Sequence, residues 1–182
     1  MSEPKDQIPP KPSTAPDSGQ SPAAVAKCPK HFTQEKDNSC VIASSRNIIR
    51  QLTGKDVPES QLRDEMNTII GEPDHDWDKI GTLPSKAVKL LDNHGVKAKI
   101  VAGKKVSNDD LAALTAKGKP AMIGFINPAH RVIFDSVTTG EDGEKTFNVR
   151  DPDPKYKGEM RKMTEDEFNA KRSPKAPIIV PL

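Results

Sequence analysis

A periodic pattern of apolar residues begins near residue 40, directly after three polar residues. The apolar positions follow the 3.6-residue period of a helix and end before Gly54; they are Val41, Ile42, Ile48, Ile49 and Leu52. Asp37, Asn38 and Ser39 stand in front of them as candidate N-cap side chains. The pattern therefore predicts a buried helix of about 13 residues with Cys40 in its first turn.

The chain beyond this helix is predicted to form more helices and then mainly strands. We expect helices near 61–69, 83–94 and 108–117, strands at 96–101 and 121–126, a short capped helix at 164–168 and a last strand at 178–180. The apolar runs 130–137 and 146–150 flank a turn-rich loop at 139–144, which is typical of a β-hairpin. Helices first and an antiparallel sheet afterwards predict an α+β fold.

Residues 1–27 differ in composition from the rest of the chain. They are rich in Pro, Ser, Ala and Lys, and Ile8 and Val25 are their only β-branched aliphatic residues. Such a segment buries too little apolar surface to offset the entropy of ordering it, so we interpret it as a flexible linker. Residues 28–182 then form one domain. The linker favours a module joined to a delivery domain or carrier, with a plain disordered tail as the alternative.

Charge and hydropathy argue against several classes of partner. The 28 Lys and Arg residues nearly balance the 26 Asp and Glu residues, so we expect neither nucleic acid nor a membrane as partner. No apolar run reaches the roughly 18 residues of a membrane span, and the N-terminus lacks the apolar core of a secretory signal. We therefore expect a soluble protein whose secretion, if it occurs, does not use a signal peptide.

Cys40 is the candidate nucleophile. A thiol in the first turn of a helix lies beside unpaired N–H groups and the positive end of the helix dipole, an environment that favours the reactive thiolate. Gln34 precedes it by six residues, and at that distance a side-chain amide can fold back beside the Cys40 N–H to complete a two-donor oxyanion hole. A small buried residue is the alternative for any lone Cys.

His130 and Asp151 are the candidate base and orienting carboxylate. His130 opens one strand of the expected hairpin, and Asp151 closes the other in Asn148-Val149-Arg150-Asp151-Pro152. The start of one antiparallel strand lies near the end of its partner, so the two side chains should share an edge of the sheet. His130 would then take the Cys40 proton and Asp151 would orient the imidazole, although Asn148 and Asp153 remain alternatives for the orienting role.

Gln34, Cys40, His130 and Asp151, in this order, resemble the site of the papain-like cysteine peptidases. The Cys and His are 90 residues apart, which is shorter than the papain-type spacing and is similar to the compact bacteriocin-processing peptidases. Within that branch, "SCVIASSRNIIRQLTG", "GKPAMIGFINPAHRVIFDSV" and "FNVRDPDP" look most like the papain-fold toxin domains of bacterial polymorphic toxins. The resemblance covers most of residues 32–168.

The resemblance implies a cysteine peptidase that works through a thioester and needs no cofactor or metal. It implies a toxin or effector of interbacterial competition, secreted without a signal peptide and active in the cytoplasm of a target bacterium. The partners implied are a protein substrate in that cell, a cognate immunity protein in the producer, and a delivery domain joined through the N-terminal linker.

Several alternatives remain open at this stage. The same residues would serve glutamine deamidation or transglutamination, or the processing of leader peptides, and a non-catalytic binding module is the non-enzymatic alternative. Val41 stands where many peptidases of this clan have Gly, so we expect it to crowd the cleft and narrow the substrate range. Cys28 and His31 have a ligand-like spacing, but no second pair at metal spacing completes a zinc site. We interpret Cys28 as a spare thiol, because a disulfide with Cys40 would silence the nucleophile. Trp77 either rims the cleft or packs inside the domain.

Overall fold

The computed structural model describes residues 30–182. The expected linker at 1–27 and Cys28 lie outside the described residues. Within the described part of the chain, none of the helices combines the length and the apolar character needed to cross a bilayer.

Three helices form the first half of the described chain. They are α1 (Cys40–Thr53), α2 (Glu59–Ile70) and α3 (Ala87–Asn93), and the first two end at glycines in the left-handed conformation, Gly54 and Gly71. The expected helix at 83–94 is divided, because Pro84 begins a separate 3₁₀ turn, Pro84–Lys86, after Leu83 in extended backbone. The predicted position of the Cys40 helix is confirmed to within one residue.

The second half of the chain builds a six-stranded antiparallel sheet. Its strands are β1 (Ala98–Val101), β2 (Ala121–Phe125), β3 (His130–Thr139), β4 (Lys145–Arg150), β5 (Met160–Thr164) and β6 (Ile178–Pro181), in the spatial order β1-β6-β2-β3-β4-β5. The predicted β3–β4 hairpin is present, with a register shift between Phe134 and Ser136. β5 was not predicted; it pairs with β4 as the edge strand.

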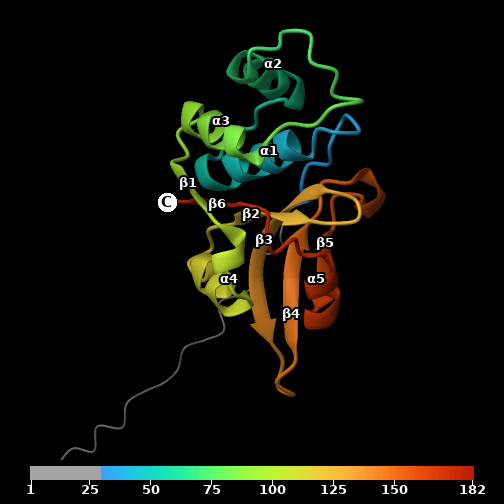
Figure 1. Cartoon of the computed structure of the whole chain (residues 1–182). Coiled ribbons are helices and arrows are strands. Elements are labelled where there is room, and N and C mark those ends of the chain that lie inside the picture. The colour runs from blue at the N-terminus through green and yellow to red at the C-terminus, as the bar shows by residue number, and fades with distance from the viewer. Residues whose placement is uncertain (1–29) are drawn as a thin grey trace, which may run out of the picture.

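The sheet buries both of its faces, so the domain has two hydrophobic cores. Met122, Ile133 and Ile179 face the layer of α1, α2 and α3. Their neighbours along each strand point the other way because strand side chains alternate, and they pack with α4 (Asn108–Thr115) and α5 (Glu165–Lys171). Figure 1 shows α1, α2 and α3 at one end of the molecule and α4 and α5 beside the strands. Helices packed on an antiparallel sheet confirm the predicted α+β fold.

Contact between α1 and β3 brings the two halves of the chain together at the candidate site. Ser44 lies one turn after Cys40, is fully buried, and donates its hydroxyl hydrogen to the carbonyl oxygen of Arg131 at 3.3 Å. Arg131 is the residue after His130 in β3. The packing of α1 on the sheet therefore sets the position of the Cys40 helix relative to the His130 strand.

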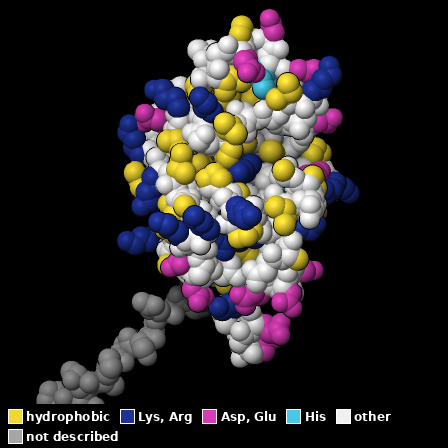
Figure 2. All heavy atoms as spheres, in the orientation of Figure 1, with side chains coloured by type: hydrophobic (Ala, Val, Ile, Leu, Met, Phe, Trp, Pro, Cys, Tyr) yellow, Lys and Arg dark blue, Asp and Glu magenta, His cyan; other side chains and the backbone are white. Residues whose placement is uncertain are grey.

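The face drawn in Figure 2 carries charges of both signs. Lys and Arg side chains are spread mainly over its middle, and Asp and Glu side chains lie mainly toward its upper and lower ends, the lower being where Figure 1 places the tip of the β3–β4 hairpin.

Candidate active site

Cys40 is the first residue of α1, at a helix end that no side chain caps. The first turn contains no acidic residue, and Ser39, the N-cap residue, makes no capping hydrogen bond. The expectation that Asp37, Asn38 or Ser39 would cap this helix is wrong, because the Ser39 hydroxyl bonds Glu59 and the Asn38 amide bonds the carbonyl of Asp78. The first N–H groups of a helix have no partner inside it, so the positive end of α1 lies uncapped at the half-buried Cys40.

His130 faces Cys40 from the first position of β3. A short loop, 126–129, joins it to the end of β2, and Phe125 and His130 are paired across that hairpin. Its Nε2–H donates to Oδ1 of Asp151 at 2.6 Å, which leaves Nδ1 for the thiol. Cys40 is among the groups that raise the pKa of this imidazole, which places the thiol near the ring. Cys40, His130 and Asp151 thus lie together on one cleft, with the imidazole bonded to the carboxylate.

Asp151 is a buried carboxylate with three hydrogen-bond donors. Its side chain is 3% exposed and accepts from His130, from the backbone N–H of Asp153 at 3.1 Å and from Nη1 of Arg161 at 2.6 Å. The sequence left Asn148 and Asp153 as alternatives, and the structure places neither against the imidazole. Asn148 bonds Ser136, and the Asp153 side chain caps the turn Pro154–Tyr156.

Arg161 belongs to the site and was missed by sequence reasoning. It lies on β5, pairs with Asp151, and stacks its guanidinium 4.1 Å from the ring centroid of Tyr156. The segment Met160–Thr164 is too polar to read as a strand, and an ion pair between residues ten positions apart leaves no local pattern. The signal that would have found it is the need of a buried carboxylate for a positive partner.

The electrostatics of the site favour a protonated imidazole. Burial works to lower the pKa of His130, but hydrogen bonds to Asp151 and Cys40 outweigh it and raise this pKa to about 9. Burial likewise works to raise the pKa of Asp151, and the bonds from His130, Asp153 and Arg161 hold it below its ordinary value. At neutral pH the pair is therefore an imidazolium and a carboxylate, and an imidazolium beside a thiol is the setting in which catalytic cysteines ionise.

A cleft of ≈ 260 Å³ opens onto these side chains. Besides Cys40, His130 and Asp151, its lining comprises Gln34, Asp37, Asn38, Phe125, Ile126, Asn127, Pro128, Ala129, Asp153, Lys155, Tyr156, Arg161 and Lys171. One wall thus comes from the segment before α1, another from the β2–β3 loop, and the third from residues that follow β4. All four residues predicted from the sequence as site residues lie on one cleft.

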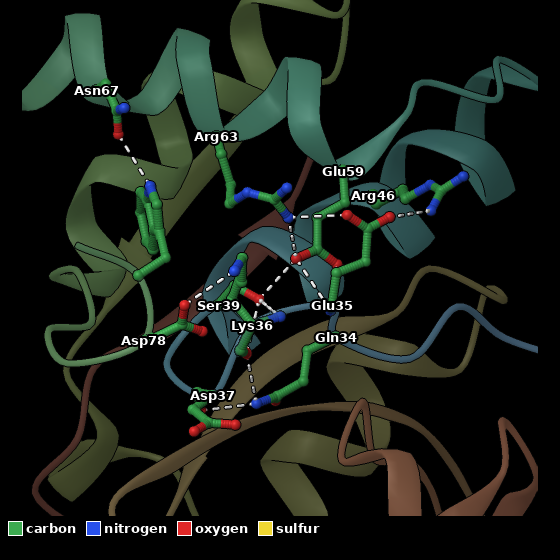
Figure 3. Close-up of polar contacts among 11 residues, drawn as sticks. Gln34, Glu35, Lys36, Asp37, Ser39, Arg46, Glu59, Arg63, Asn67 and Asp78 are labelled. Carbon is green, nitrogen blue, oxygen red and sulfur yellow. Dashed lines mark hydrogen bonds and ion pairs between the residues drawn. The ribbon is translucent and has the colours of Figure 1, made fainter. Parts of the chain in front are cut away.

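The side-chain amide of Gln34 is held by the turn that precedes α1. Its Nε2 donates to the carbonyl oxygens of Lys36 at 3.0 Å and Asp37 at 2.8 Å, as Figure 3 shows, while its buried Oε1 has no partner. This orientation is the favourable one, because exchanging O and N would place Oε1 against two carbonyl oxygens. Gln34 lines the same cleft as Cys40, with both amide hydrogens bonded inside its own turn. Its role as an oxyanion donor stays a prediction, which requires one of these hydrogens to leave its carbonyl.

The segment before this turn is tied to the loop that carries Asp151. The backbone N–H of Gln34 donates to the carbonyl of Pro152 at 2.7 Å, and that of His31 donates to Gly158 at 3.0 Å. The buried His31 ring also donates from Nε2 to the carbonyl of Asp151 at 2.8 Å. Burial lowers the pKa of His31, so the ring is neutral and serves as a structural donor. These bonds fix Gln34 and Asp151 relative to each other.

Two further expectations are settled by burial. Val41 is 2% exposed and packs in the core beneath α1, so the expectation that it crowds the cleft is wrong. Trp77 also packs in that core, with its ring N–H donating to Asn67 at 3.0 Å, and it does not line the cleft. Within residues 30–182, no group of three His, Cys, Asp or Glu side chains has the arrangement of a metal site.

A solved structure with the same architecture links this cleft to a known class of fold. The chain is similar to a double-glycine motif protease from an AMS/PCAT transporter, crystallised in complex with the leader peptide. Sequence identity is 18% and the TM-score is 0.58, with 83% of this chain and 89% of that chain covered. The chain has a papain-like peptidase fold. No family model and no curated protein matches it.

The papain-like fold explains why the residues of the cleft come from distant parts of the sequence. In this chain the helical half supplies the thiol and the sheet half supplies the imidazole and carboxylate. The arrangement can carry out nucleophilic attack on a carbonyl, proton transfer to a leaving group, and stabilisation of an oxyanion at a helix N-terminus.

Proposed function

We propose that this protein is a cysteine peptidase that hydrolyses a peptide bond through a thioester on Cys40. The observation that carries the proposal is that one cleft is lined by Cys40, at the start of a helix, and by His130, which is hydrogen-bonded to the buried Asp151. A helix N-terminus and a neighbouring imidazolium favour the thiolate, and a buried carboxylate orients and stabilises the imidazolium.

Each step of the reaction has a residue to perform it. The Cys40 thiolate attacks the carbonyl carbon, and the oxyanion that forms is held by the Cys40 N–H and one hydrogen of the Gln34 amide. His130 gives its proton to the departing amine, which leaves a thioester and a neutral imidazole. His130 then takes a proton from water as the water attacks the thioester. The carboxylate product leaves, and the thiolate and imidazolium are restored.

Cleavage of proteins in a bacterial lysate tests this proposal. We expect wild-type protein to create new protein N-termini, mapped by mass spectrometry, and Cys40→Ala to create none, because the alanine variant has no nucleophile to form the acyl intermediate. The exchange keeps Cβ and removes only the sulfur of a partly buried side chain at the margin of the core.

Thr53→Ala is a matched control for that experiment. It also changes a residue of α1, at the opposite end of the helix, and should leave the new termini unchanged. Identical termini with wild type and Cys40→Ala would contradict the proposal. Mass changes at glutamine side chains without new termini would replace it with deamidation.

We further propose that the substrate is a cytosolic protein of a competing bacterium. The support is the likeness of three segments, around Cys40, His130 and Asp151, to papain-fold toxin domains. On this view the protein is delivered through its N-terminal segment, and an immunity protein in the producer blocks the cleft. The substrate found in the lysate should then be one whose cleavage stops growth when the wild-type protein, but not Cys40→Ala, is made in the cytosol of a bacterial host.

A further inference from the structure

Glu59 is a buried carboxylate that the proposed reaction does not use. It is the first residue of α2, its side chain is 0% exposed, and it does not line the cleft. Burial raises the pKa of Glu59, because removing a carboxylate from water penalises its charged form. A group buried at such a cost is expected to have a specific set of partners.

The partners of Glu59 are both ends of the segment Glu35–Ser39, which leads directly into Cys40. At the first end, the backbone N–H of Glu35 donates to Oε1 and Oε2, each at 3.1 Å. At the last end, the Ser39 hydroxyl donates to Oε1 at 2.6 Å. Arg63, one turn along α2, adds a third donor to Oε1 at 2.9 Å and also binds the Glu35 carboxylate at 2.9 Å (Figure 3). One side chain of α2 therefore closes this segment into a turn.

The turn held in this way is the one that holds Gln34. Lys36 donates its N–H to the Ser39 hydroxyl at 3.1 Å, and Ser39 donates its N–H back to the Lys36 carbonyl at 3.1 Å. The carbonyl oxygens of Lys36 and Asp37 accept the two hydrogens of the Gln34 amide. Figure 3 shows the contacts in sequence, from α2 through the turn to Gln34. The positions of Gln34 and of the start of α1 thus depend on contacts made by Glu59.

We infer that Glu59 is a positioning residue for the oxyanion hole. It acts through the turn Glu35–Ser39, whose shape fixes the Gln34 amide and the Cys40 N–H as a pair of donors. The catalytic part of this inference rests on the proposed function. The effect of Glu59 on the position of Gln34 is a property of the folded chain and can be measured without substrate.

Three variants of α2 separate this role from general stability. Glu59→Ala removes every hydrogen bond that the Glu59 side chain makes to the turn. Glu59→Gln keeps an oxygen at Oε1, which accepts from Glu35, Ser39 and Arg63, and replaces Oε2, a second acceptor for the Glu35 N–H, by an NH2 group that cannot accept. Glu65→Ala is the matched control, because Glu65 lies on the same helix and bonds Gln61 and His94, away from the turn.

The first readout is the NMR signal of the Gln34 side-chain amide, assigned by its loss in Gln34→Ala. We expect two protected hydrogens in wild type, Glu59→Gln and Glu65→Ala, and rapid exchange with solvent in Glu59→Ala. The second readout is steady-state hydrolysis of the substrate identified in lysate. Glu59→Ala should lower kcat by about 10²-fold with little change in KM, as removal of an oxyanion donor does, and Glu59→Gln should restore most of it.

A protected Gln34 amide in folded Glu59→Ala would overturn the inference. If that variant does not fold, Ser39→Ala decides the question, because it deletes one hydroxyl group of the same network. We expect Ser39→Ala to increase hydrogen exchange at the Gln34 amide. Unchanged exchange in this variant would also overturn the inference. A wild-type protein without Cys40-dependent hydrolysis would instead remove the proposed function, and the Gln34 signal would still decide whether Glu59 holds the turn.

Discussion

Replacing His130 by alanine is expected to lower kcat/KM for peptide hydrolysis by about 10⁴-fold or more. The imidazole bonds Asp151 and lines the cleft with Cys40, and in the proposed reaction it both supports the thiolate and protonates the leaving amine. Without it the amine must leave as an unprotonated anion, which raises the barrier of the first step. The measurement is the initial rate of cleavage of the substrate protein found in lysate.

His94→Ala is the matched control for His130→Ala. His94 is also a partly buried histidine paired with a carboxylate, Glu65 at 2.9 Å, but it lies at the end of α3 away from the cleft. Its removal should leave the rate within a few-fold of wild type. A His130→Ala protein with close to the wild-type rate would rule out this residue as the acid and base of the reaction.

The second large effect is expected for Asp151→Asn, with a fall in kcat of about 10³-fold to 10⁴-fold. The amide keeps the shape of the carboxylate but no longer stabilises the imidazolium, so the pKa of His130 should fall from about 9 toward its ordinary value. Asp153→Asn makes the same exchange two residues away, at a side chain that caps a turn, and should change kcat only slightly. Equal losses in the two variants would contradict the assignment of Asp151.

The pH dependence of stability gives Asp151→Asn a second test. Because the pKa of His130 is raised above 6.5 in the folded protein, the contribution of His130 to the free energy of unfolding is complete below pH 6.5. It is lost as the pH rises through about 9. It is on the order of 3 kcal/mol for a shift of this size. Asp151, whose pKa is lowered in the folded protein, stabilises the fold at pH values above the ordinary pKa of Asp. This stabilisation is lost as the pH falls through the lowered pKa. Urea unfolding across this range should show the loss on the alkaline side in wild type and a flatter profile in Asp151→Asn.

The sequence was informative wherever the chemistry of the site follows from local pattern. The apolar period after residue 40 placed Cys40 in the first turn of a helix, and the hairpin signal brought His130 and Asp151 to one edge of the sheet. Both are short-range patterns that fix backbone geometry directly.

Contacts between distant segments were not predictable in this way. Arg161 bonds Asp151, ten positions earlier in the chain, and Glu59 bonds residues twenty or more positions before it. Charged residues are usually exposed, so the sequence did not indicate that these two side chains are buried or partly buried. Val41 was misjudged from its position next to the nucleophile, although a rotation of about 100° per helical residue turns it away from the thiol and into the core. The uncapped start of α1 was missed because Ser39, a good capping residue by type, bonds Glu59 instead.

Trapping of the acyl intermediate tests the central claim most directly. The substrate protein is incubated with wild-type protein in the presence of increasing hydroxylamine, and the C-terminus of the released N-terminal fragment is identified by mass spectrometry. A thioester on Cys40 would partition between water and hydroxylamine, so we expect a C-terminal hydroxamate whose share rises with hydroxylamine. A carboxylate alone at every concentration would contradict the thioester, and hydroxamate on glutamine side chains would show that the amide attacked is not in the main chain.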